Sequence, residues 1–214
     1  MREKEKVTRV ILVRHGETDF PINRIYCDSK EDPALNAAGQ AQARQAAEFL
    51  AEEDVSAIYA SPCLRTQMTA AAIAMHHEQM SVVHESGLVE RNFGVWEGMY
   101  FEEIESQYPK QYMEWKENQA AFKPDSGGES VYDLAERVCP VLARIVTAHS
   151  GQTVVVVAHV GPIRVLLAKA LNIPIEGYRQ LAIDPASMSG IDYGMSQNNL
   201  IFMNFHGRHF GMLK

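Results

Sequence analysis

A short apolar run that ends in an Arg-His-Gly triplet constrains this 214-residue chain more than any other feature. Val10 to Val13 are all apolar, and a run without polar alternation is typical of a strand buried on both faces of a parallel sheet. Arg14, His15 and Gly16 follow at once, and the glycine lets backbone approach a ligand closely. We therefore expect a guanidinium and an imidazole at the carboxyl end of a buried strand, where open α/β sheets bind their ligands.

The Arg14-His15 pair has the chemistry of a phosphoryl-transfer site. A neutral imidazole is a nucleophile near physiological pH, and a guanidinium holds phosphoryl oxygens through paired N–H donors. This pattern suggests attack by His15 on phosphorus while Arg14 fixes the phosphate. The alternative is a strand that ends in a salt-bridged arginine and a structural histidine, which would be the better interpretation of an isolated pair.

A second strand-to-helix junction carries another cation. Residues 55–60 predict a strand, and Pro62 can begin the helix that follows it. Arg65 then lies in the first helical turn, on the same sheet edge as His15. A cation at a helix amino terminus opposes the helix dipole, so an anion nearby would explain it better than solvent exposure does.

A third junction supplies a second imidazole. Residues 153–158 include four consecutive valines and predict the strongest strand of the chain, which ends at His159. Pro162 can start the next helix. Three junctions therefore offer cationic or imidazole groups at one sheet edge, which is difficult to attribute to chance.

The remaining pattern predicts an α/β fold. Helical periodicity follows an amino-terminal cap at Asn36 and recurs from Ser130, where Pro140 should kink or split the helix. Residues 188–193 and 200–206 predict two final strands. We expect a three-layer structure with a mostly parallel sheet, flanking helices and an antiparallel C-terminal edge.

Composition excludes several classes of protein. The net charge of −7 gives no basic field for nucleic acid, and no apolar run reaches the length that spans a membrane. The charged residues 1–6 do not form a signal peptide. The three cysteines, Cys27, Cys63 and Cys139, are odd in number and lack metal-type spacing, so we expect reduced thiols in a cytoplasmic protein.

Five segments in the same order resemble motifs of the histidine phosphatase superfamily, which also contains cofactor-dependent phosphoglycerate mutase. They are Arg14 to Thr18, Ser61 to Arg65, Leu88 to Glu90 with Phe93 to Gly98, Gly128 to Ser130, and Ala158 to Gly161. The first is highly specific, and the others are strong jointly. The resemblance covers nearly the whole chain and implies a phosphoglycerate mutase-like fold.

The resemblance also implies a role for each residue of the constellation. His15 would be the nucleophile that becomes phosphohistidine, and Arg14, Arg65 and His159 would hold the phosphoryl oxygens. Glu90 matches the acid that protonates the leaving alkoxide, a role that needs a carboxyl pKa raised by burial or by anions. No metal and no cofactor are implied. The alternative for Glu90 is a surface salt bridge with the neighbouring arginine.

Other positions depart from the family pattern or are less specific. Many members carry an asparagine where this chain has Pro21, and Asn23 is the nearest candidate to replace it. The family turn Arg-x-x-Gly is here residues 24–27, without the glycine. Thr18 is a further donor to the phosphate, or else a turn hydroxyl, and Gly161 is a further candidate at the substrate.

The function that this resemblance implies is a metal-independent phosphomonoesterase acting on a small phosphorylated metabolite. The alternatives are a phosphoglycerate mutase and a non-catalytic phospho-ligand-binding member. In the mutase branch an insertion supplies extra arginines. Residues 101–122 contain no arginine, and their basic residues are Lys110 and Lys116, which favours hydrolysis. A binding protein would be expected to lack one of the catalytic groups.

The chain is expected to form a single domain, residues 1–214, with a small helical lid insertion around residues 99–126. The lid aromatics could accept an apolar or nucleoside-like leaving group, or could form the core of the lid itself; they are Tyr100, Phe101, Tyr108, Tyr112 and Trp115. The alpha-ribazole phosphatase branch and the broad-specificity branch are both compatible. The sequence predicts neither the substrate nor an oligomeric state.

Overall fold

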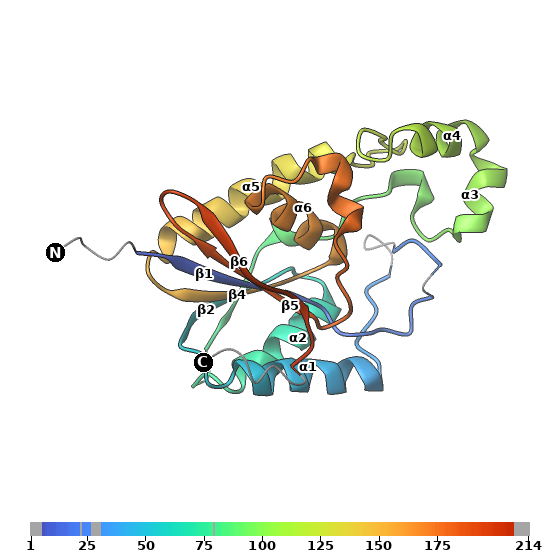
Figure 1. Cartoon of the computed structure of the whole chain (residues 1–214). Coiled ribbons are helices and arrows are strands. Elements are labelled where there is room, and N and C mark those ends of the chain that lie inside the picture. Colours follow the sequence, from blue (N-terminus) through green and yellow to red (C-terminus); the bar gives the residue numbers. More distant parts are fainter. Residues whose placement is uncertain (1–5, 22, 27–30, 79, 208–214) are drawn as a thin grey trace.

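A computed structural model describes residues 6–21, 23–26, 31–78 and 80–207 (Figure 1). Residues 1–5 and Cys27, which were considered above, lie outside these ranges. Six strands form one sheet in the order β3-β2-β4-β1-β5-β6. Their bounds are β1 Thr8–Arg14, β2 Val55–Ala60, β3 Val82–His84, β4 Thr153–Ala158, β5 Met188–Tyr193 and β6 Asn198–Phe205. The first four are mutually parallel, and β5 and β6 are antiparallel, so the predicted fold class is confirmed.

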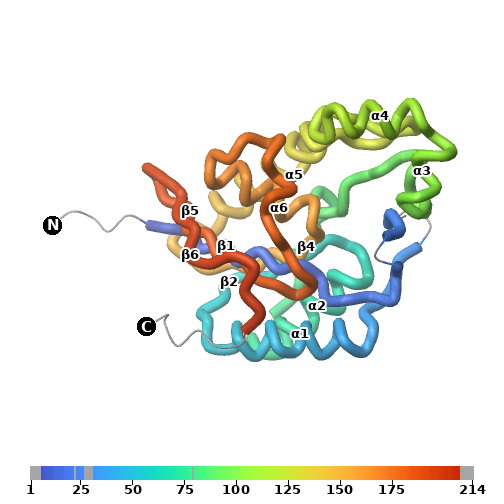
Figure 2. Tube along the Cα trace, turned by 45° about the vertical axis from the view of Figure 1, so that its right-hand side comes forward, coloured from blue at the N-terminus to red at the C-terminus, as the bar shows by residue number. Residues whose placement is uncertain are grey.

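Two pairs of helices cover the two faces of this sheet, as Figures 1 and 2 show. On one face lie α1, Ala37–Leu50, and α2, Leu64–Ala74. On the other lie α5, Val131–Ala148, and α6, Val160–Ala170. Asn36 caps α1 as predicted, because its side chain accepts a hydrogen bond from the Gly39 N–H at 2.8 Å.

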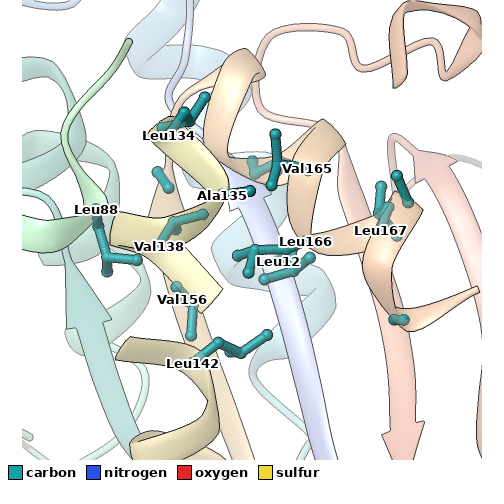
Figure 3. Packing of buried hydrophobic residues seen from close by; sticks show 14 of the residues in the cluster. Leu12, Leu88, Leu134, Ala135, Val138, Leu142, Val156, Val165, Leu166 and Leu167 are labelled. Carbon is teal, nitrogen blue, oxygen red and sulfur yellow. The ribbon is translucent and has the colours of Figure 1, made fainter. Parts of the chain in front are cut away.

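The central strand β1 contributes to both layers of the core. Val10 and Leu12 pack with α5 and α6, whereas Ile11 and Val13 pack with α1 and α2. All four are at most 1% exposed. Figure 3 shows the first layer, where Leu12 lies among side chains of α5 and α6. Because β1 is buried on both faces, its carboxyl end is held firmly, and this is the end that carries Arg14 and His15.

The three prolines behave differently from the predictions. Helix α2 begins at Leu64 after an extended Cys63, so Pro62 precedes the helix. Helix α6 begins at Val160, so Pro162 is its third residue, where a backbone N–H has no intrahelical partner in any case. Helix α5 continues through Pro140 without a break, with the exposed proline on its outer side.

Two short helices, α3 at Phe101–Gln107 and α4 at Pro109–Glu117, lie apart from the sheet beside one end of α5 (Figure 1). They occupy the predicted lid region and pack around a small apolar cluster of their own, which includes Trp96 and Ile104. Three 3₁₀ helices complete the chain: η1 Ser86–Leu88, η2 Gly94–Trp96 and η3 Ile175–Gln180. Among the described residues, no helix combines the length and apolar character that crossing a membrane requires.

Candidate active site

The sheet order brings the three predicted junctions together. Strand β4 lies between β1 and β2, and Arg14 is paired with Ala158 in the register of β1 and β4. The next residues, His15 and His159, therefore emerge side by side, with ring centroids 5.2 Å apart. The helix that follows β2 brings Arg65 into contact with the second ring. The pairing of β1 with β4 thus brings together two histidines that are about 140 residues apart in the sequence.

The ring of His15 is oriented for nucleophilic attack. Its Nδ1 lies 2.8 Å from the Gly16 carbonyl oxygen, which can only accept, so Nδ1 carries the proton and Nε2 keeps its lone pair. Burial lowers the pKa of His15 well below 6.5, and the charges of Arg65 and Arg14 lower it further. The imidazole is therefore neutral at physiological pH, with Nε2 available.

Both ring nitrogens of His159 are engaged by protein groups. Arg65 Nη2 donates to Nδ1 at 3.0 Å, and because a guanidinium has no acceptor, Nε2 must carry the proton that it donates to Ser61 Oγ at 2.9 Å. The side chain is completely buried, and burial with the Arg65 charge lowers the pKa of His159 well below its usual value. His159 thus fixes Arg65 as a neutral acceptor.

The two arginines of the constellation are held in different ways. Arg14 donates from Nη1 to the Ile183 carbonyl at 2.7 Å, and its buried Nε has no hydrogen-bond partner among the described residues. Burial lowers the pKa of Arg14. Arg65 is completely buried, with the ring of Tyr26 lying 4.4 Å from its guanidinium carbon and an Asp32 carboxylate 3.7 Å from Nη1.

Glu90 lines the same cavity as His15. Its carboxylate accepts hydrogen bonds from the backbone N–H groups of Arg91, at 2.7 Å, and Gly161, at 3.2 Å. The Arg91 guanidinium instead donates to the carbonyls of Glu129 and Phe122. A Cβ at Gly161 would come within 2.2 Å of a Glu90 oxygen, so only glycine allows this close approach.

A cavity of about 620 Å³ opens in front of His15, and its lining comes from the sheet edge, the lid and the segment around η3. The predicted residues that line it are Arg14, His15, Thr18, Glu90 and Gly161. Arg65 and His159 lie behind this surface, both completely buried. Tyr26 belongs to the lining and covers Arg65 from the cavity side.

Thr18 and Asn23, the two further candidates in the first loop, lie in different places. Thr18 is buried and its hydroxyl lies 2.8 Å from the Tyr26 hydroxyl. Asn23 is exposed and does not line the cavity, and its amide nitrogen lies 3.4 Å from a Glu102 oxygen on α3. Asn23 therefore lies beside the lid helix α3, and its replacement of the family asparagine stays a prediction.

Sequence reasoning missed four residues of the site. Ser61 contacts His159 and Tyr26 contacts Arg65, and Arg164 and Arg179 line the same cavity as His15. Ser61 could have been found because it directly follows a strand at the same sheet edge. The other three carry no such signal. In the described part of the chain, no group of three or more histidine, cysteine or acidic side chains could hold a metal ion.

Several proteins with similar sequences are named as phosphatases. The chain is 33% identical to phosphoserine phosphatase 1 of Hydrogenobacter thermophilus over 201 residues, 92% of each protein. It is 34% identical to a metal-independent phosphoserine phosphatase of Arabidopsis thaliana, covering 78% of this chain and 70% of that one. A bifunctional protein of Mycobacterium tuberculosis is 37% identical over 85% of this chain, which spans 49% of that longer protein.

The fold and the family agree with these relatives. The structure of mycobacterial glucosyl-3-phosphoglycerate phosphatase superposes with a TM-score of 0.83 and 27% identity, covering 94% of this chain and all of that one. An alpha-ribazole-5'-P phosphatase assigned in Escherichia coli gives a TM-score of 0.84 with 26% identity, over 95% of this chain and 98% of that one. The sequence model of the histidine phosphatase superfamily, branch 1, matches residues 10–206. With the two histidines adjacent at the edge of the sheet, the earlier resemblance is confirmed: this chain belongs to the histidine phosphatase superfamily, branch 1.

Proposed function

We propose that this member of the family hydrolyses phosphomonoesters of small metabolites through a transient phosphohistidine at His15. The observation that carries the proposal is a neutral imidazole with an unprotonated Nε2 at His15, a residue that lines a cavity of about 620 Å³ together with Arg14. A cavity of this volume suits a small molecule. The relatives named above, which act on phosphoserine or glucosyl-3-phosphoglycerate, support a substrate of this size.

In the first half-reaction, the Nε2 lone pair of His15 attacks phosphorus in line with the leaving oxygen. The P–N bond forms as the P–O bond to the leaving group breaks, and a proton passes from Glu90 to that oxygen. Arg14 faces the transferring group and stabilises its equatorial oxygens. Phosphoryl transfer through a loose transition state depends mainly on such positioning and charge stabilisation.

In the second half-reaction, Glu90 accepts a proton from a water molecule that attacks the phosphohistidine. The P–O bond to water forms, the P–N bond breaks, and His15 returns to its neutral form as inorganic phosphate leaves. The two backbone N–H donors of Arg91 and Gly161 hold the Glu90 carboxylate in one place through both steps. The same carboxyl therefore serves first as acid and then as base.

Arg65 and His159 act from behind His15. When the ring of Tyr26 moves off the Arg65 guanidinium, the N–H groups it covered can bind phosphoryl oxygens. His159 keeps Arg65 oriented through the hydrogen bond from Nη2. Thr18, whose hydroxyl lies beside that of Tyr26, is placed to accompany this movement.

No step of this mechanism uses a metal ion or a cofactor, which agrees with the name of the Arabidopsis relative. Cys139 is a free thiol, which supports the cytoplasm as the compartment. A phosphoglycerate mutase would return the phosphoryl group to its substrate, and the arginine-free stretch from residue 101 to residue 122 argues for hydrolysis.

The test is to trap the phosphorylated protein. Wild-type protein mixed briefly with a ³²P-labelled phosphomonoester should retain acid-labile, alkali-stable label and should hydrolyse p-nitrophenyl phosphate in excess chelator. His15→Ala should do neither, whereas His84→Ala, which removes an exposed histidine on the edge strand β3, should do both. Label on the His15→Ala variant, or activity that chelation abolishes, would overturn the proposal. Interconversion of phosphoglycerates faster than phosphate release would identify a mutase.

A further inference from the structure

The part of the cavity that is lined by α6 and η3, which we call its far end, holds two arginines that the reaction at His15 does not use. Arg164 lies on α6 and Arg179 lies in η3, and both line the same cavity as His15. The chain segment after η3 fixes this region, because the Leu181 carbonyl accepts from Arg164 Nε at 2.8 Å and the Ile183 carbonyl accepts from Arg14. The backbone carbonyls of one short segment thus hold both Arg14 and Arg164.

Other charged side chains on the cavity wall have partners within the protein. Asp184 accepts hydrogen bonds from the side chains of Asn204 and His206. Arg24 donates to both carboxylate oxygens of Glu31, at 2.9 and 2.8 Å. These groups are therefore already satisfied and are poor candidates for recognising a ligand.

Arg164 and Arg179 are different, because no carboxylate of a described residue lies within ion-pair distance of either. Arg179 is exposed at the cavity mouth, donates to the Gln119 side chain at 3.2 Å and lies 5.7 Å from the Trp115 ring of the lid. The Nη atoms of Arg164 make no hydrogen bond to a described residue. Burial lowers the pKa of Arg164, and the nearby Arg179 charge also lowers it, although Tyr178 and Glu90 act in the opposite direction.

We propose that Arg164 and Arg179 form a subsite for a second anionic group, so that the preferred substrates are phosphomonoesters whose leaving group carries a carboxylate or another phosphoryl group. Two neighbouring guanidinium groups repel each other until an anion lies between them, and their planar N–H forks match both kinds of oxyanion. The proposal rests on the proposed function and names the class of leaving group for the same site.

The other side chains that line the cavity determine which groups the rest of the substrate can carry. Aromatic side chains from the first loop and the lid face this space, among them Phe20, Phe101 and Trp115. They offer few hydrogen bonds to the middle of a ligand. The cavity therefore suits a compact molecule that is anionic at both ends and makes mainly van der Waals contact between them.

Matched substrate pairs test the subsite. We would measure kcat/KM for 3-phosphoglycerate against glycerol 3-phosphate, which differ by a carboxylate, and for fructose 1,6-bisphosphate against fructose 6-phosphate. The wild type should favour the doubly anionic member of at least one pair. In Arg164→Gln and Arg179→Gln that preference should fall roughly ten- to a hundredfold, the size expected for a lost charge-assisted hydrogen bond. Arg144→Gln, an exposed arginine of α5 that pairs with Glu85, should keep the wild-type ratio.

The outcomes separate this proposal from the proposed function. A loss of preference in the carboxylate pair assigns a carboxylate, and a loss in the bisphosphate pair assigns a second phosphoryl group. If the wild type hydrolyses p-nitrophenyl phosphate but neither ratio depends on Arg164 or Arg179, the subsite is overturned and the phosphatase remains. If p-nitrophenyl phosphate itself is not hydrolysed, the proposed function fails first. Arg179 is exposed, so its variant keeps the test valid even if Arg164→Gln unfolds.

Discussion

The cavity has a phosphate end at His15 and a far end at Arg164 and Arg179. The two ends differ in how the protein holds their charged side chains. At the phosphate end, His159 and Arg65 are completely buried and bonded to each other, and both follow strands of one sheet. At the far end, Arg164 is half-buried and Arg179 is exposed, on a helix and a 3₁₀ turn that also contact the lid. The first region is fixed by strand pairing, whereas the second depends on loops and side chains.

This contrast suggests a division of labour. Groups that must stabilise a transition state need a rigid, water-poor setting, where electrostatic interactions are strong. Groups that only recognise the leaving group can lie on more exposed elements, where loop changes alter specificity without disturbing the chemistry. Substitutions at the first end should therefore affect all substrates alike, and those at the second should change the preference between substrates.

The largest expected effect belongs to the buried arginine. Arg65→Met keeps an elongated side chain but removes the charge, and kcat should fall by about 10³ for alkyl and aryl phosphates alike, as for other lost transition-state donors. Steady-state kinetics with glycerol 3-phosphate and p-nitrophenyl phosphate would measure it, with circular dichroism to confirm folding. A loss for only one of the two substrates would erase the distinction between the two ends.

Substitution of Glu90 should give an effect that depends on the reaction step. In Glu90→Gln, p-nitrophenolate can leave without a proton. Rapid mixing with p-nitrophenyl phosphate should therefore show a burst of this product equal to the enzyme concentration. Slow turnover should follow, reduced about 10²-fold by the loss of the base. With an alkyl phosphate the burst should disappear. A burst slowed equally for both substrates would assign Glu90 to binding and not to proton transfer.

The smallest effect concerns stability and pH. The pKa of His15 and of His159 is lowered well below 6.5 in the folded protein, so below that pH the unfolded chain binds protons that the folded chain does not. The free energy of unfolding should therefore fall on acidification by about 1.4 kcal/mol per pH unit for each ring, until the folded pKa is reached. Above pH 6.5 both states are neutral and the contribution is constant.

Urea denaturation across this range would measure the slope. His15→Ala should lose one ring's share of the pH dependence, whereas His84→Ala, on the exposed edge, should keep the wild-type slope. Parallel slopes for all three proteins would mean that the buried rings do not stay neutral, and the phosphate end would then lack its low-polarity character.

The sequence predicted the phosphate end well because periodicity there has a single physical meaning. A continuous apolar run such as Val154 to Val157 must be buried on both faces, so the residue after it must emerge at a sheet edge. That rule places His15 and His159 at one sheet edge, and their direct contact follows from the pairing of β1 with β4, which the periodicity does not predict. The strands at residues 55–60 and 188–193 agree with their predicted bounds as well.

The far end could not be predicted in this way. Arg164 occurs in the middle of a helix and Arg179 in a short turn, and nothing in their neighbours distinguishes them from solvated surface charges. Their nearness comes from the packing of η3 on α6, which is a tertiary property. Asn23 is a similar case, because its residue type and its loop do not predict that its amide lies beside Glu102 of the lid.

In the proposed mechanism, the ring of Tyr26 competes with the phosphoryl group of the ligand for Arg65. Any phosphoryl group that reaches this arginine must displace an aromatic ring, so the observed affinity is the intrinsic one reduced by the population of the covered form. Inorganic phosphate faces the same competition after hydrolysis. Return of the ring would favour departure of the product, and turnover would then gain from a contact that weakens binding.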